Sequence, residues 1–184
     1  MISFVNKFLF IIILAGLGIF LLNSFVFAAS VAISPATINT AANSQFTITI
    51  TISNVTNLFG AAFDLIFNPG VLSFVSAQKG SFLEQGANTT LLTAVNPAGD
   101  LIVGYSRLAV GGVSTGVNGS GNLMTLTFNA LSAGTSGLTF QNNNLCDASG
   151  SECNPISATW NNGNVVVTSS DTTPPAAPTG VTVW

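Results

Sequence analysis

Few side chains in this protein could take part in acid–base, nucleophilic or metal chemistry. Among 184 residues there are six carboxylates, three basic side chains, two cysteines and no histidine. Without histidine the chain cannot build a Ser-His-Asp triad or a histidine-ligated metal site. Glycoside hydrolysis needs two carboxyl groups flanking a cleft, and no motif pairs the carboxylates here. We therefore expect a protein that is not an enzyme and that holds no cofactor of its own.

The two cysteines, Cys146 and Cys153, lie close together in a polar segment that also contains Asp147 and Glu152. This segment has two interpretations, a disulfide or a metal site. Two carboxylates without a histidine make a poor transition-metal site, and the spacing of an EF-hand calcium loop is absent. A close cysteine pair in an exported protein is typical of a disulfide. We expect a Cys146–Cys153 disulfide and no metal site.

Residues 1–28 have the composition of an export signal. Lys7 precedes an unbroken apolar run over 8–22, and Val26 and Ala28 are the small residues expected before a cleavage site. The alternative is an uncleaved anchor, because the run is almost long enough to span a bilayer. We expect cleavage after Ala28 and a secreted, extracellular or cell-surface protein. Contact with a membrane would then arise only through this segment, if it stays uncleaved.

The elements that position the remaining side chains are predicted to be strands. Apolar residues alternate with threonines over 45–54, and 122–130 repeats this pattern, which is typical of half-buried strands. Turn signals separate further strand candidates at 31–34, 59–67, 72–78, 89–95, 100–108, 136–141, 155–160 and 163–168. The predicted fold is all-β, a two-sheet jelly-roll β-sandwich of about nine strands, preceded by a signal-peptide helix.

Charge excludes one class of partner, and composition indicates where the domains begin and end. Charged residues are 5% of the chain and the formal net charge is −3, so there is no basic patch for nucleic acid. The β-sandwich is expected to occupy 29–168, followed by a Pro/Thr/Ser-rich linker over 169–178. Residues 179–184 resemble the first strand of a fibronectin type III domain. Because a lone strand cannot fold, we expect them to begin a further, truncated domain.

The order of these elements resembles the cohesin family, the dockerin-binding modules of bacterial scaffold proteins, over residues 31–168. No single motif carries the resemblance. The matching pieces are the opening strand 31–34, the alternating strand 45–54, the Asn68-Pro69-Gly70-Val71-Leu72 corner, the glycine-led strand 121–128 and the closing strand 163–167. The family is related in fold to carbohydrate-binding modules. The resemblance implies a flat sheet face that docks a dockerin, a small partner on which any calcium is expected to lie.

In the family, that face uses outward residues of the strands that match 59–67 and 100–108. Alternation along these strands predicts that the partner-binding face consists of Asp64, Ile66, Val103, Tyr105 and Arg107. Well-known type I cohesins carry Asn and Asp where this chain has Gly60 and Ala62, which puts recognition of a standard type I dockerin in doubt. The expected function is dockerin docking in an assembly linked to polysaccharide breakdown. The alternatives are a carbohydrate-binding module and a structural or adhesive spacer.

Overall fold

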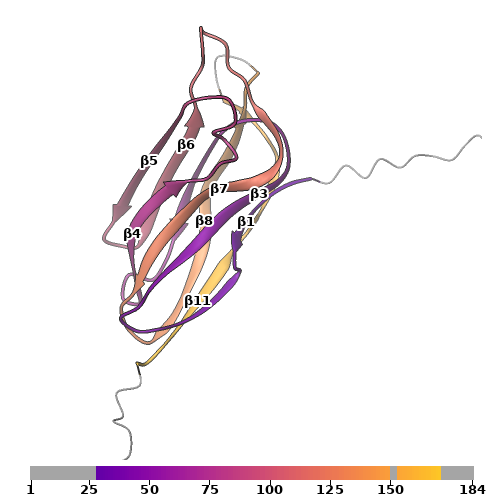
Figure 1. Cartoon of the computed structure of the whole chain (residues 1–184). Coiled ribbons are helices and arrows are strands. Elements are labelled where there is room, and N and C mark those ends of the chain that lie inside the picture. Colours follow the sequence, from indigo (N-terminus) through magenta and orange to yellow (C-terminus); the bar gives the residue numbers. More distant parts are fainter. Residues whose placement is uncertain (1–27, 150–152, 171–184) are drawn as a thin grey trace, which may run out of the picture.

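The computed structural model describes residues 28–149 and 153–170, which form an elongated all-β body (Figure 1). The described residues contain no helix long and apolar enough to cross a membrane. The expected signal segment up to residue 27, the linker beyond residue 170 and the segment 179–184 lie outside the described residues.

Eleven strands lie in the described part of the chain. They are β1 (Ala29–Ser34), β2 (Thr37–Ala41), β3 (Gln45–Ile66), β4 (Leu72–Lys79), β5 (Thr89–Asn96), β6 (Asp100–Arg107), β7 (Val117–Ala130), β8 (Gly134–Asp147), β9 (Asn154–Pro155), β10 (Ala158–Asn161) and β11 (Gly163–Thr168). Most neighbours are antiparallel, whereas β1 pairs with β10 and β2 pairs with β11 in parallel.

The strands form two layers that share the long strand β3. The first half of β3 pairs with β7 on one side and β1 on the other, and β4 and β10 extend this layer outward. The second half of β3 pairs with β6 and β8, and β5, β11 and β2 complete the other layer. We call these the β4–β7–β3–β1 layer and the β5–β6–β3–β8 layer. Both share β3, so all strands belong to one hydrogen-bonded network.

The passage of β3 between the layers takes place at two asparagines. Asn54 and Asn57 have φ angles of 55° and 57°, in the left-handed region that asparagine tolerates better than most residues. The pairing with β7 shifts register between Ile52 and Val55 and again between Val55 and Leu58. Such irregularities bend a strand and increase its twist. The bend therefore gives the two halves of β3 different neighbours and different outer surfaces.

The core lies between the layers and is built from inward residues of both. Along the first half of β3, Ile48, Ile50 and Ile52 are buried while the intervening threonines face outward. Phe128 of β7 is fully buried. The centre of its ring lies 5.9 Å from that of Phe46, 5.4 Å from that of Phe67 and 5.7 Å from that of Phe74. Aromatic pairs at such distances add to the stabilisation from burial.

The all-β sandwich class is confirmed, and the strand count differs from the expected nine. The sequence did not predict strand β2, because three of its five residues are polar and Ile38 is its one buried residue. The two strands expected at 45–54 and 59–67 are one continuous strand, since the intervening Asn-Val-Thr-Asn segment bends without ending the pairing. Residues 155–160 divide into the short strands β9 and β10.

Candidate functional site: the outer face of the β5–β6–β3–β8 layer

In the outer face of the β5–β6–β3–β8 layer, β5, β6 and β3 lie in register, and β8 borders β3 with Asn144 opposite Ala62 and Gln141 opposite Asp64. Ala62 of β3 pairs with Gly104 of β6, which pairs with Leu92 of β5. One step along, Asp64 pairs with Ile102, which pairs with Ala94. We call this surface the apolar face; its outward residues are Ala62, Asp64, Ile66, Thr90, Leu92, Ala94, Ile102, Gly104 and Ser106. Leu92 is 67% exposed and Ile102 is 48% exposed, so apolar side chains stand in solvent here.

The side chains that were predicted to point outward do so on β3 but not on β6. Asp64 and Ile66 are half-buried and lie on the apolar face. Val103, Tyr105 and Arg107 are 2%, 1% and 4% exposed, and they point into the sandwich. The strand itself was located correctly, but the phase of its alternation was reversed. Tyr and Arg are polar by type, which favours an outward position, but loop carbonyls accept their hydrogen bonds inside the sandwich.

Arg107 is satisfied by backbone groups of two loops. Its Nε donates to the carbonyl of Thr115 at 2.7 Å, and its Nη1 donates to the carbonyl of Leu83 at 2.6 Å. The first acceptor belongs to the loop after β6, and the second to the loop between β4 and β5. A buried cation is tolerable only when its donors are paired. The guanidinium therefore ties the two loops together beneath the apolar face.

Tyr105 extends this buried polar cluster. Its hydroxyl donates to the carbonyl of Gly80 at 3.0 Å. Burial raises the pKa of the Tyr105 phenol above its ordinary value of 10.0; a hydrogen bond with Thr89 lowers it, the Glu84 carboxylate raises it and Arg107 lowers it. Tyr105 and Arg107 are thus buried structural groups under the face, and Tyr105 also contributes to the lining of a depression in it.

A depression of about 370 Å³ lies at one end of the apolar face. Its floor is made by small residues, Gly60, Ala62, Gly104 and Ser106, and Leu92 stands at its rim. A methyl group added at Gly104 would meet no atom within 4 Å, so the space above this glycine is open. The remaining lining residues are Phe59, Ala61, Thr90, Tyr105, Ser114, Cys146, Asp147, Ala148 and Cys153.

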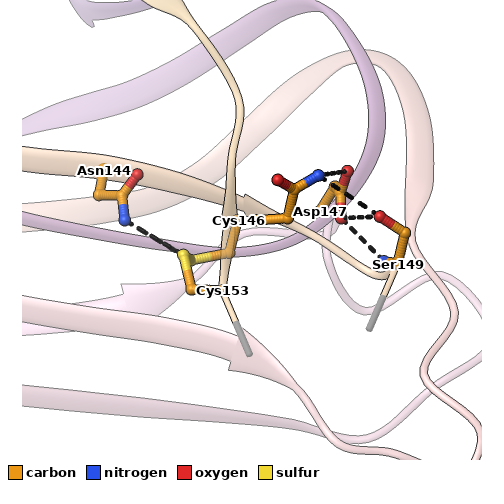
Figure 2. Close-up of a disulfide and its surroundings, with 6 residues drawn as sticks. Asn144, Cys146, Asp147, Ser149 and Cys153 are labelled. Atoms are coloured by element: carbon orange, nitrogen blue, oxygen red, sulfur yellow. Dashed lines mark hydrogen bonds between the residues drawn. A yellow bond between two sulfur atoms is a disulfide. The ribbon is translucent and has the colours of Figure 1, made fainter. Parts of the chain in front are cut away.

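The predicted disulfide between Cys146 and Cys153 is present and forms part of the wall of this depression. The two Cα atoms lie 4.9 Å apart, and the amide of Asn144 donates to the sulfur of Cys153 at 3.1 Å (Figure 2). The disulfide fixes the start and end of a polar loop beside β8. The wall of the depression is therefore held covalently.

Asp147 accepts hydrogen bonds beside the disulfide. Its carboxylate accepts from the hydroxyl and the backbone N–H of Ser149, at 2.6 and 2.8 Å (Figure 2). It also accepts from the amide of Asn154 at 2.8 Å. The bonds from Ser149 hold the pKa of Asp147 below its ordinary value of 3.8, and Asn154 adds to the effect. Asp147 therefore keeps a negative charge at the edge of the depression.

The charges on and around the apolar face are all negative within the described residues. Asp64 and Asp100 lie on β3 and β6, and Asp147 lines the depression. The two basic residues of the described chain lie elsewhere: Arg107 is buried, and Lys79 belongs to β4 in the other layer. No group of three or more Cys, Asp or Glu residues in the described ranges could hold a metal ion. The face is apolar and acidic.

A sequence profile of the Cohesin domain family matches residues 31–167. The chain belongs to the cohesin family. The matched region begins within β1 and ends within β11, so it contains the whole sandwich and both layers. No curated protein matches this cohesin in sequence.

Solved structures of other cohesins share its fold at low sequence identity. A non-cellulosomal cohesin from the archaeon Archaeoglobus fulgidus is 18% identical, with a TM-score of 0.62, covering 79% of this chain and 94% of that one. A type I cohesin–dockerin complex from Clostridium thermocellum gives 17% identity and a TM-score of 0.64, covering 78% and 96%. A type II cohesin from the cellulosome of Acetivibrio cellulolyticus gives 17% and 0.61, covering 76% and 95%.

Sequence reasoning missed three residues that shape the apolar face: Leu92, Ile102 and Gly104. Leu92 and Ile102 were treated as ordinary strand residues, because exposed and buried aliphatic side chains look alike in sequence. The available signal was the alternating series Leu101, Val103 and Tyr105, whose bulk fits the core better than the series of Ile102 and Gly104. The depression has no sequence signal, since it needs the register of three strands.

Proposed function

We propose that this cohesin docks a dockerin-type protein module on the apolar face of its β5–β6–β3–β8 layer. The main support for the proposal is that the exposed side chains of Leu92 and Ile102 lie on the same face as the depression. Exposed apolar patches on soluble domains mark interaction sites. The type I complex from Clostridium thermocellum contains a cohesin bound to a dockerin, and family membership brings the same class of partner to this chain.

The module acts by binding and not by catalysis in this proposal. Asp64 and Asp100 lie on the neighbouring strands β3 and β6, and the lining of the depression contains one carboxylate, Asp147, where glycoside hydrolysis needs two. Its setting is a secreted or cell-surface assembly that takes part in polysaccharide breakdown. Residues 1–28 would direct export, and 169–178 would link the sandwich to a following domain that begins at 179–184. Calcium, where needed, would be held by the dockerin.

The polysaccharide alternative has weaker support. Binding to a flat polysaccharide favours a row of exposed aromatic rings. The large hydrophobic side chains that stand exposed in the described residues are all aliphatic. Trp160 is half-buried, with its ring 5.0 Å from that of Phe140 and 5.9 Å from that of Phe63. It packs against the core and is not a free platform for sugar.

Calorimetry on the full chain tests the proposed function. A panel of recombinant type I and type II dockerins is titrated in calcium, and soluble glucans and xylans form a second panel. The proposal predicts saturable binding to at least one dockerin and no heat from the sugars. Sugar binding without dockerin binding would assign the protein to the carbohydrate-binding class. If neither panel gives measurable binding, the remaining interpretation is a structural spacer.

A further inference from the structure

The depression on the apolar face has room for a partner's side chain. Gly60, Ala62, Gly104 and Ser106 form its floor, so no large side chain of this protein occupies the space. The space above Gly104 is open, and the φ of this glycine is not in the left-handed region. A side chain at position 104 would therefore be tolerated by the fold. Glycine here keeps a hollow open, and the backbone conformation does not require it.

The lining of the depression is mainly apolar. Leu92 rises at one side, and the Cys146–Cys153 disulfide closes another. The loop after β6 contributes Ser114, next to a tight turn in which Val110 and Val113 are 67% and 62% exposed. The hydroxyl-bearing residues of the lining are Thr90, Ser106 and Ser114, and most of the lining is apolar. A neutral polar side chain entering this space would therefore lose more hydrogen bonds to water than it gained, which is costly. An apolar side chain would gain from leaving water.

The negative charges around the depression favour basic residues next to that side chain on the partner. Asp147 borders it, and Asp64 lies further along the apolar face on β3. Asp64 accepts a hydrogen bond from the amide of Asn142, and Asp147 accepts from Ser149 and Asn154. These donors are neutral, and no basic side chain of the described residues forms an ion pair with either carboxylate, so both can attract cations of a partner. Complementary charges at an interface raise the association rate and fix the orientation of the partner.

We propose that the partner of this cohesin places one bulky apolar side chain, Leu, Ile, Met or Phe, in the depression above Gly104, with Lys or Arg beside it facing Asp147 and Asp64. The inference rests on the proposed function and specifies the surface of the dockerin that binds. The small residues and the open space are complementary to a bulky apolar side chain, and the acidic border is complementary to a basic one. A partner that presents Ser or Thr above Gly104 does not fit.

Selection from a dockerin library tests this directly. The exposed helix positions of a dockerin scaffold are randomised, and clones are selected on the immobilised full-length protein in calcium. Enrichment of a bulky apolar residue with a neighbouring Lys or Arg is the expected result. Enrichment of Ser, Thr or acidic residues would overturn the inference while leaving the dockerin function intact. If no clone is enriched, both the function and the inference fail.

A pair of variants checks that the selected clones use the depression. Gly104→Val fills the open space, and Gly137→Val makes the same change at an exposed glycine on β8, where an added methyl meets only the Thr139 hydroxyl at 3.8 Å. Gly104→Val should weaken binding at least tenfold, and Gly137→Val should leave it unchanged. Equal binding by the two variants would overturn the inference. Thermal unfolding of both verifies that each variant is folded.

Discussion

The two layers of the sandwich have outer surfaces of opposite character, although the same strand passes through both. On the β4–β7–β3–β1 layer, Thr47 faces Thr127 and Thr49 faces Thr125, so hydroxyl-bearing pairs cover the surface. On the β5–β6–β3–β8 layer, the second half of β3 presents Ala62, Asp64 and Ile66 beside exposed aliphatic residues. Threonine is favoured on the half-exposed faces of strands, where its hydroxyl can bond to water. The difference supports the proposal that the partner binds the apolar face and that the threonine surface stays in contact with water.

The largest expected effect separates side chains beneath the apolar face from those on it. Arg107→Met should lower the free energy of unfolding by about 3 kcal/mol, because the carbonyls of Leu83 and Thr115 lose a charged donor inside the protein. Lys79→Met is the control. Lys79 also donates to a backbone carbonyl, that of Thr89 at 2.7 Å, and lies 3.7 Å from Glu84, but its side chain is 38% exposed, so water can replace the lost donor. Urea denaturation measures both. An equal, small effect of the two variants would show that Arg107 is not a structural residue.

Binding should distinguish the exposed aliphatic residues of the two layers. Leu92→Ala on β5 should weaken partner binding by about 2 kcal/mol, or about 30-fold, as expected for an anchor at the centre of an interface. Val75→Ala makes a comparable change on β4 of the other layer, where Val75 is 44% exposed. Calorimetry with a dockerin that binds should show no loss for Val75→Ala. If both variants bind the partner more weakly, the two layers do not differ in binding and the proposal is contradicted.

The disulfide links the apolar face to stability. The double variant Cys146→Ser, Cys153→Ser should lower the free energy of unfolding by about 2 kcal/mol, because a short loop loses its covalent closure. Partner binding should weaken severalfold as well, since the wall of the depression is no longer fixed. Urea denaturation and calorimetry on the same preparation measure the two effects. Unchanged binding would show that the partner does not touch this wall.

The smallest effect concerns Tyr105, the single tyrosine of the chain. Tyr105→Phe should cost about 1 kcal/mol of stability, because the carbonyl of Gly80 loses its donor. The folded-state pKa of this phenol is raised above 10.0, so the native state keeps its proton after the unfolded state has lost it. The stability of the wild-type protein should therefore fall as pH rises above 10.0. Denaturation at alkaline pH should show less of this decline in the variant.

The sequence predicts the sandwich well because period-two alternation is strong where threonine and isoleucine alternate, as over 45–54. It predicts the disulfide because two cysteines lie close together in a polar segment. The face of β6 could not be predicted with the same success, since Tyr105 and Arg107 are polar by type and buried by context. Their partners are carbonyls of Gly80, Leu83 and Thr115, and backbone acceptors leave no mark in a sequence.

The central claim is that the partner binds the apolar face and leaves the threonine surface free. Methyl NMR tests it most directly, because Leu92 and Ile102 report on one layer and Thr47 and Thr127 on the other. On addition of a dockerin that binds, the account predicts large shifts of the Leu92 and Ile102 methyl signals and unchanged signals of the two threonines. Shifts confined to the threonines would contradict the account and place the partner on the opposite layer.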